Sequence, residues 1–208
     1  MEIKYLGYFS FRIKGKTVVL VTDPPSSSLG LKLPSLLADV VLISGKKAQG
    51  DPLLVNKAVN REQPFVVDSP GEYEIGGSFI LGLKLEKDEN LFVVTIDELR
   101  LAFFGDLTGS LSDKQLEEID GVDILFLPVG LGKIFSPKKA VDLINQIEPK
   151  IIIPMAYQIP GLSSEELLPV SEFLKEMGIE QITPQEKLII SKDKLPLEKE
   201  VVVLNARN

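Results

Sequence analysis

Hydrophobic and polar positions in the first hundred residues alternate, or form short apolar runs, as is typical of β-strands. Residues 2–6 and 9–14 alternate, a Gly15-Lys16 turn follows, and residues 17–22 form a β-branched run that ends before Asp23-Pro24. This pattern predicts an antiparallel meander. Further strands are predicted at 39–44, 65–68, 71–75, 78–86, 91–96 and 100–104, and a short helix at 53–60.

The period of the hydrophobic positions changes to that of helices beyond residue 111. Ser112 and Ser136 precede two helical patterns, and Pro137 falls in the first turn of the second helix. A third helix is predicted at 165–177, where the internal Pro169 would kink or divide it. Predicted strands alternate with these helices at 123–127, 151–155, 188–191 and 201–204.

One arrangement occurs twice along the chain. A strand, Asp23, a connection and the run 39–44 (DVVLIS) in the first half correspond to a strand, Asp106, a connection and the run 123–128 (DILFLP) in the second. Chance similarity of hydrophobic strands is the alternative explanation. We interpret the repeat as two half-units that pack face to face. This predicts a single α/β domain over residues 1–208, a four-layer αββα sandwich of two mixed β-sheets with outer helices.

Composition narrows the possible partners and location. The net charge of -7 opposes general binding to nucleic acid, which depends on lysine and arginine. No apolar run approaches the roughly 18 to 20 residues that a membrane-spanning helix needs. The first residues alternate charged and apolar side chains instead of forming an apolar leader, and the chain contains no cysteine. We therefore expect a cytoplasmic protein that binds neither nucleic acid nor membrane.

The absence of histidine restricts the chemistry further. Histidine is the side chain that titrates near neutral pH and the commonest metal ligand. Because the chain has neither histidine nor cysteine, carboxylates, backbone oxygens and water remain as ligands. These donors suit magnesium or calcium better than zinc.

Six sequence blocks carry a family resemblance. They are YLGYFSFRIKGKTVVLVTDP (5–24), ADVVLISGKKAQGD (38–51), VVDSPGEYEIGG (66–77), LRLAFFGDLTGSLSDKQLEEI (99–119), VDILFLPVG (122–130) and AVDLINQIEPKIIIPMAYQIPG (140–161). In order and spacing they resemble small stand-alone hydrolases of the metallo-β-lactamase fold, most of all the branch related to ascorbate-6-phosphate lactonase. The resemblance extends to about residue 178 and implies the metallo-β-lactamase-like form of the predicted sandwich.

The resemblance also implies a set of metal ligands, which this chain mostly lacks. In the family, histidines occur in an opening Leu-Gly-His-Ser block, in a His-x-His-x-Asp-His loop, in a loop after the strand matching 79–85, and in a Pro-Met-His-Tyr pattern. An aspartate in a Gly-Asp pair is a further ligand, and Asp106 retains it. The other matching positions hold Tyr8, Gly45, Lys47, Gln49, Gly50 and Ala156, and the third loop is shortened to 86–90.

Because lysine, glycine and alanine cannot replace zinc ligands, the sequence predicts a protein without a metal cofactor. The leading hypothesis is a non-catalytic binding or interaction module for an unidentified protein or small molecule. Lys46 or Lys47 would pair with Asp106, helped by a tyrosine hydroxyl, or both lysines would face solvent. The former cleft is expected to contain Tyr8, Gly45, Lys46, Lys47, Gln49, Gly50, Asp51, Asp106, Ala156 and Tyr157.

Two other functions stay open at this point. One is a hydrolase of phosphoester or lactone substrates that uses carboxylates with magnesium, or a lysine of lowered pKa. The other is a structural subunit of a homo-oligomer or larger complex. An exposed apolar patch at an edge strand would favour the subunit.

Overall fold

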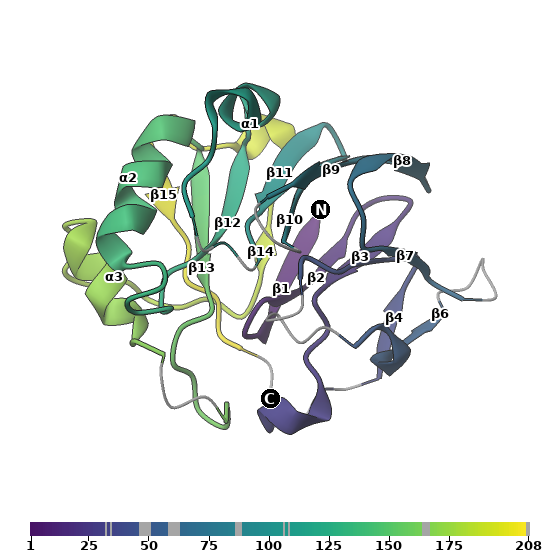
Figure 1. The fold of residues 1–208 in the computed structure, drawn as a ribbon, viewed down its shortest axis with the longest axis horizontal. Coiled ribbons are helices and arrows are strands. Elements are labelled where there is room, and N and C mark those ends of the chain that lie inside the picture. The colour runs from purple at the N-terminus through teal and green to yellow at the C-terminus, as the bar shows by residue number, and fades with distance from the viewer. Residues whose placement is uncertain are drawn as a thin grey trace.

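Two β-sheets lie face to face in the computed structural model (Figure 1). Of the 208 residues, the structure describes 1–31, 33, 35–45, 51–57, 63–85, 89–105, 107, 109–163 and 167–206. Aromatic rings join the two sheets: Phe11 contacts Phe126 with ring centroids 4.7 Å apart, and Phe126 stacks on Phe103 at 4.2 Å. The main core therefore lies between the sheets.

The first sheet has six strands among the described residues, in the order β14, β1, β2, β3, β5, β7. They are β1 (Glu2–Gly7), β2 (Ser10–Lys14), β3 (Val19–Thr22), β5 (Val40–Leu42), β7 (Phe65–Val67) and β14 (Leu188–Ile189). The first three form the predicted antiparallel meander. Strands β5 and β7 then extend the sheet in parallel.

The second sheet has seven described strands, in the order β15, β13, β12, β11, β10, β9, β8. They are β8 (Gly71–Ile75), β9 (Ser78–Lys84), β10 (Asn90–Ile96), β11 (Leu99–Phe103), β12 (Ile124–Pro128), β13 (Ile151–Met155) and β15 (Glu200–Val201). Strands β9, β10 and β11 are antiparallel, and β12 and β13 follow in parallel. Both sheets thus repeat one pattern, which confirms the predicted sandwich of two mixed sheets.

The described α-helices all belong to the second half of the chain, beside β12 and β13 in Figure 1. The outer face of the first sheet instead packs against a two-stranded ribbon, through a small cluster that includes Val21, Val41 and Val55. The α-helices are α1 (Asp113–Glu118), α2 (Pro137–Ile147) and α3 (Val170–Glu176). The 3-10 turns are η1 (Ser27–Leu29), η2 (Pro52–Leu54) and η3 (Lys192–Lys194). The strands of the ribbon are β4 (Leu36–Ala38) and β6 (Val55–Lys57).

Two predicted helices differ from the structure. The helix predicted at 53–60 is a single 3-10 turn followed by β6, and residues 58–60 lie outside the described ranges. The third helix starts later than predicted, because Pro169 is its N-cap and not an internal kink. Proline has no N–H and a fixed φ, so it is tolerated at a helix start and disfavoured in the interior.

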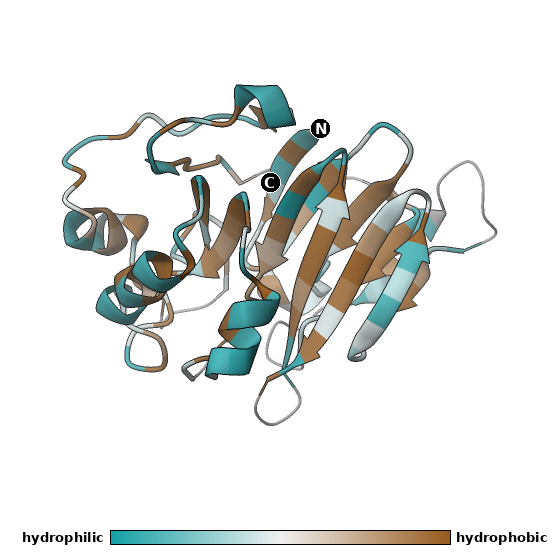
Figure 2. Cartoon of the chain, turned by 90° about the horizontal axis from the view of Figure 1, so that it is seen from above, coloured by the Kyte–Doolittle hydropathy of each residue, from teal (hydrophilic) through white to brown (hydrophobic). Residues whose placement is uncertain are grey.

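Hydropathy follows the layers of the sandwich. Hydrophobic residues concentrate on the strands, and the helices carry hydrophilic residues (Figure 2). None of the described helices combines the length and apolar character that crossing a membrane requires. The cytoplasmic location expected from the sequence stays a prediction.

Candidate functional site at the carboxyl edge of the sheets

Asp23 and Ser44 join the carboxyl ends of two neighbouring parallel strands. Asp23 follows β3, Ser44 lies two residues beyond β5, and both are almost completely buried. The Ser44 backbone N–H donates to Asp23 Oδ1 at 2.8 Å, and the Ser44 hydroxyl donates to Asp23 Oδ2 at 2.7 Å. A buried carboxylate needs such donors to offset its lost hydration. The pair therefore fixes the two strand ends relative to each other.

The second sheet approaches this pair closely. A side chain at Gly105, two residues beyond β11, would collide with the Ser44 side chain and lie 3.0 Å from Asp23 Oδ2. Only glycine fits there. Asn90, at the start of β10, donates its N–H to the Ser44 carbonyl at 2.7 Å. The edge is thus assembled from both half-units, and the chain continues from Gly105 directly to Asp106.

Three of the six described non-glycine residues with a positive φ angle lie at the same edge. Tyr8, Asp23 and Ala156 have φ angles of 57°, 35° and 51°, in a region that non-glycine residues seldom adopt. The Ala156 N–H donates to the Tyr8 carbonyl at 2.8 Å, which ties the end of β13 to the β1–β2 turn. Gly130 lies against them, since a Cβ there would be 2.5 Å from Tyr157 Cα. Unfavourable conformations that persist because the surroundings hold them often mark functional sites.

Two buried tyrosines support this edge from the core. The Tyr5 hydroxyl donates to the Tyr8 carbonyl at 2.9 Å, and the Tyr157 hydroxyl donates to the Leu204 carbonyl at 3.2 Å. Burial raises the pKa of both hydroxyls well above the usual value for tyrosine. Both therefore stay protonated and act here as hydrogen-bond donors to the backbone.

The predicted cleft residues are described only in part. Tyr8, Ala156 and Tyr157 share the edge just described, and Gly45 follows Ser44 and is buried. Asp51 is half-buried, donates its N–H to the Pro24 carbonyl and caps η2. Lys46, Lys47, Gln49, Gly50 and Asp106 lie outside the described residues. The pairing of a lysine with Asp106 therefore stays a prediction.

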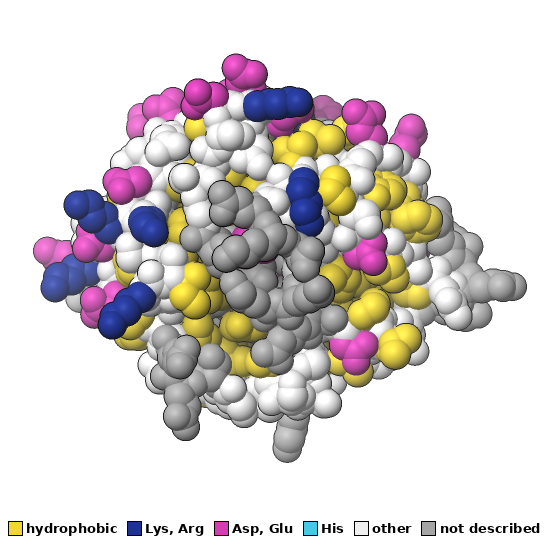
Figure 3. Space-filling view, in the orientation of Figure 1, with side chains coloured by type: hydrophobic (Ala, Val, Ile, Leu, Met, Phe, Trp, Pro, Cys, Tyr) yellow, Lys and Arg dark blue, Asp and Glu magenta, His cyan; other side chains and the backbone are white. Residues whose placement is uncertain are grey.

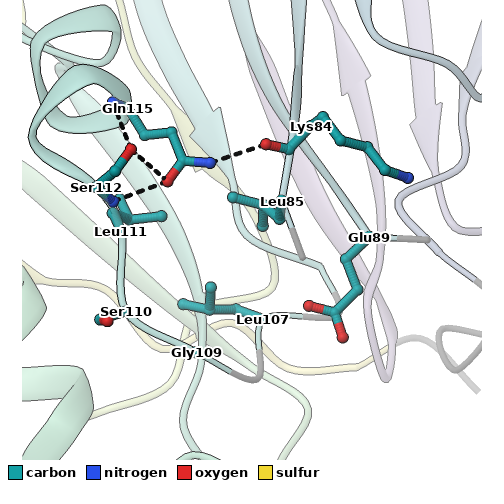
Figure 4. Close-up of a pocket in the computed structure, with 9 residues that line it drawn as sticks. All are labelled: Lys84, Leu85, Glu89, Leu107, Gly109, Ser110, Leu111, Ser112 and Gln115. Atoms are coloured by element: carbon teal, nitrogen blue, oxygen red, sulfur yellow. Dashed lines mark hydrogen bonds between the residues drawn. The ribbon is translucent and has the colours of Figure 1, made fainter. Parts of the chain in front are cut away.

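A pocket of about 410 Å³ lies near this edge (Figure 4). Its apolar walls include Leu85, Leu107 and Leu111, and the carboxylate of Glu89 points toward Leu107. Glu89 is only 5% exposed. Glu89 was not among the predicted cleft residues, although a glutamate within the shortened loop 86–90 was a usable signal.

Gln115 closes one side of this pocket. Its Oε1 accepts from the Ser112 N–H at 2.8 Å, which completes a capping box at the start of α1. Its Nε2 donates to the Lys84 carbonyl at 2.8 Å and so connects α1 to the end of β9. These contacts hold the Gln115 amide in place. Gln115 thus shapes this side of the pocket.

The described residues do not fit a transition-metal ion. The chain has no histidine and no cysteine, and within the described ranges no three acidic side chains come together as a metal-binding group. Zinc requires three or four nitrogen, sulfur or oxygen donors. No reaction step through zinc can be derived from this donor set.

Known proteins identify the superfamily. The family model described as "Beta-lactamase superfamily domain" matches residues 2–156, well over half of the chain. The chain belongs to this family. A solved Thermotoga maritima structure, titled "putative Zn-dependent hydrolase of the metallo-beta-lactamase superfamily", is 30% identical, covers 99% of both chains and has a TM-score of 0.81.

Curated relatives named UPF0173 are similar to this chain over different lengths. A UPF0173 metal-dependent hydrolase of Pelotomaculum thermopropionicum is 26% identical, over 92% of this chain and 97% of its own. A UPF0173 protein of Pyrococcus abyssi is 39% identical over 71 residues, 34% of this chain and 33% of its own. Of these two relatives, the one that aligns over nearly its whole length is named a metal-dependent hydrolase.

The prediction of a non-catalytic module is wrong. Relatives that align over most of their length are named metal-dependent hydrolases, which points to hydrolysis and not to a lost site. The error came from equating the absence of histidine with the absence of activity. Histidine is one of several proton acceptors and cation ligands, and carboxylates can also serve in both roles.

Proposed function

We propose that this chain is a hydrolase of the metallo-β-lactamase superfamily. The observation that carries the proposal is the 30% identity to the Thermotoga maritima protein over 99% of both chains. The relatives named metal-dependent hydrolases support the same reaction class. The chain's own geometry agrees with it, because a rigid, strained edge and a nearby pocket with a buried carboxylate suit a reaction site.

The described residues contribute mainly by holding the reaction edge in place. The Asp23–Ser44 pair and the close approach of Gly105 fix the position from which Asp106 follows in the chain. A hydrolase must position water and substrate within a few tenths of an ångström, and rigid supporting contacts provide this. Since the donors of the described residues do not fit zinc, carboxylates are the groups that would transfer protons in this hydrolase.

The closer family resemblance suggests which bond the chain hydrolyses. The sequence blocks that resemble the ascorbate-6-phosphate lactonase branch suggest a lactone or a phosphoester as the bond that is hydrolysed. Both bonds contain an electrophilic centre, and a water molecule attacks this centre while a base accepts a proton from the water. These two classes define the first substrates to test.

The experiment is a hydrolysis assay on purified protein with a phosphodiester, bis(4-nitrophenyl) phosphate, and a lactone, γ-butyrolactone. Each substrate is tested with chelator and then with magnesium, manganese or zinc added. Asp106→Ala is compared with Asp120→Ala, a matched change at an exposed aspartate at the end of the α1 region. We expect turnover in proportion to protein concentration, lost in Asp106→Ala and kept in Asp120→Ala.

Two results would contradict the proposal. One is the absence of turnover of both substrates under every cation condition by folded protein. The other is undiminished turnover by Asp106→Ala, which would separate the activity from the edge described above. Circular dichroism of each variant establishes that a lost activity does not reflect lost folding.

A further inference from the structure

Strand β8 is the outermost described strand of the second sheet and pairs on one side only, with β9 (Figure 1). The two strands form a hairpin through the two-residue turn 76–77, whose glycines have φ angles of 62° and 81°. In such hairpins the residues that flank the turn exchange backbone hydrogen bonds, and hydrogen-bonded pairs recur at every second position. Counted from the flanking pair of Ile75 and Ser78, the N–H and C=O groups of Glu72 and Glu74 point away from β9.

These outward groups leave an open edge on the sheet. Outside the hairpin, no backbone hydrogen bond joins Glu72 or Glu74 to another described residue. Both side chains are exposed, and neither forms an ion pair with a residue that the structure describes. Free N–H and C=O groups along an edge strand are the surface to which an extended segment of another chain can pair. Strand β8 thus offers two hydrogen-bonding positions, each with a carboxylate beside it.

The inner side of this edge is apolar and partly open to solvent. Phe65 of β7 and Tyr73 of β8 come from the edge strands of the two sheets, and their ring centroids lie 6.2 Å apart. Phe65 is nevertheless 42% exposed. Hydrophobic side chains gather on the part of the surface where β7 and β8 lie, and acidic side chains border them (Figure 3). Because successive side chains of a strand point to opposite faces, a strand added beside β8 would turn every second side chain toward Phe65.

We propose that β8 binds an extended segment of a partner protein in which lysine or arginine residues alternate with apolar residues. The segment extends the second sheet as an antiparallel strand. Two of its basic residues lie opposite Glu72 and Glu74 and exchange backbone hydrogen bonds with them, while the apolar residue between them faces Phe65. Opposite charges directly across a strand pair stabilise the pairing. The proposal goes beyond hydrolysis and does not depend on it, so binding is measured without turnover.

A second copy of this chain fits the edge less well. In a symmetric antiparallel pairing of two β8 strands centred on Tyr73, Glu72 of each copy lies opposite Glu74 of the other. Like charges directly opposite each other destabilise a strand pair. The net charge of -7 adds a general repulsion between copies. Charge complementarity therefore favours a basic segment over self-association.

Four peptides with blocked ends test the proposal on the full chain, with binding measured by NMR titration at neutral pH and low salt. The parent peptide is Val-Lys-Val-Lys-Val, for which we expect saturable binding. N-methylation of both lysines removes the N–H groups that pair with β8 and should weaken binding about tenfold. N-methylation of the central valine, whose N–H points away from β8, should change affinity less than about twofold. Val-Glu-Val-Glu-Val should show no saturable binding.

Hydrogen exchange locates the bound peptide. The N–H groups of Glu72 and Glu74 should exchange rapidly in the free protein, because the register leaves them without a partner. Saturation with the parent peptide should slow their exchange at least about fivefold. The N–H of Tyr73, which pairs with β9, should change little and serves as the internal control.

Matched variants separate the charged contact from the apolar one. The double variant Glu72→Gln/Glu74→Gln keeps the shape, removes both charges and should weaken binding of the parent peptide about fivefold. Glu117→Gln removes an exposed charge on α1 and should change binding less than about twofold. Phe65→Ala should weaken binding about fivefold because it removes apolar contact area. Phe79→Ala changes an equally exposed ring on the outer face of β9 and should change binding less than about twofold.

The peptide series uses the unchanged protein, so the test does not depend on the folding of any variant. The proposal is overturned if the parent peptide does not bind saturably, or if the peptide methylated on both lysines or the glutamate peptide binds as tightly. It is also overturned if bound peptide leaves the exchange of the Glu72 and Glu74 N–H groups unchanged. Exchange of these two groups that slows with rising protein concentration alone would assign the edge to a second copy instead.

Discussion

Asp39 and Asp123 occupy equivalent positions in the two half-units. Asp39 precedes β5, accepts the Val19 N–H at 2.8 Å and donates its own N–H to the Val19 carbonyl. Asp123 precedes β12, accepts the Arg100 N–H at 2.9 Å and donates its N–H to the Arg100 carbonyl. Each aspartate thus closes the start of a parallel strand pair with the same two hydrogen bonds.

The two aspartates differ in burial and in charge compensation. Asp123 is 6% exposed, and the Lys192 ammonium lies 2.8 Å from both of its carboxylate oxygens. Asp39 is half-buried and has no ion pair with a described residue. Removing a carboxylate from water costs free energy unless donors or a cation replace the water. The repeated hydrogen bonds are therefore common to both half-units, and burial determines where a cation is also needed.

The cation comes from a segment that connects both sheets. Strand β14 lies at one edge of the first sheet and β15 at one edge of the second, with Lys192 between them in sequence. Lys187 in the same segment contacts Glu2 of β1 at 2.8 Å. Lysines in the last part of the described chain thus contact a carboxylate of each half-unit.

The largest effect in this comparison is expected for Asp123→Ala. The change removes the acceptor of the Arg100 N–H and leaves Lys192 without its partner, so we expect the free energy of unfolding to fall by about 3 kcal/mol. Urea denaturation of both proteins measures it. Asp120→Ala, at an exposed position nearby in sequence, is the control and should change stability by less than about 0.5 kcal/mol. If Asp123→Ala lowers the free energy of unfolding by less than about 0.5 kcal/mol, the contacts of Asp123 with Arg100 and Lys192 do not contribute to stability.

Asp39→Ala should have a smaller effect, about 1.5 kcal/mol, because it removes the same backbone hydrogen bond without exposing an ion-pair partner. The measurement is again urea denaturation, with an unchanged dependence on urea concentration as the sign of an intact fold. If Asp39→Ala lowers stability as much as Asp123→Ala does, the ion pair of Lys192 with Asp123 contributes nothing to stability.

Much of this fold could be predicted from the sequence because its hydrophobic period is strong. The sequence pattern predicts the meander of β1, β2 and β3, and the structure confirms it. It also predicts the repeat that contains Asp39 and Asp123, which the structure confirms as well. The run 53–60 misled because short apolar segments do not separate helix from strand, and pairing of β6 with β4 decided the outcome. Pro169 was predicted to lie inside the third helix, but it is the N-cap of α3, a position that tolerates its missing N–H.

The candidate site was harder to predict than the fold. Asp23 is visible after a strand, but its bonds to Ser44 depend on the pairing of β3 with β5. The need for glycine at 105 comes from the other sheet, which no local pattern encodes. The functional hypothesis failed because it equated the absence of histidine with the absence of activity, whereas relatives that align over most of their length are named hydrolases.

Lys192→Met should reduce stability by about 1 kcal/mol, less than either aspartate change. Asp123 keeps its backbone hydrogen bond, and the Lys192 side chain is half exposed, so water can partly replace the ammonium. The double variant Asp123→Ala/Lys192→Met isolates the pair in a double-mutant cycle. If the two single changes add without a coupling term, the ion pair makes no contribution beyond the hydrogen bonds.

The smallest effect on stability is expected at the ion pair between Lys187 and Glu2, where it depends on pH. Hydrogen bonds from Lys187 and then Lys4 lower the pKa of Glu2 from 4.5 to about 2. A carboxylate with a lowered pKa in the folded state stabilises the protein above its ordinary pKa, and this contribution is lost as the pH falls toward the folded value. Glu2→Gln should therefore cost about 0.5 kcal/mol at pH 7, a modest value because the pair is near the surface. Urea denaturation at several pH values should show the difference shrinking between pH 4.5 and 2; a difference independent of pH would assign it to packing instead of charge.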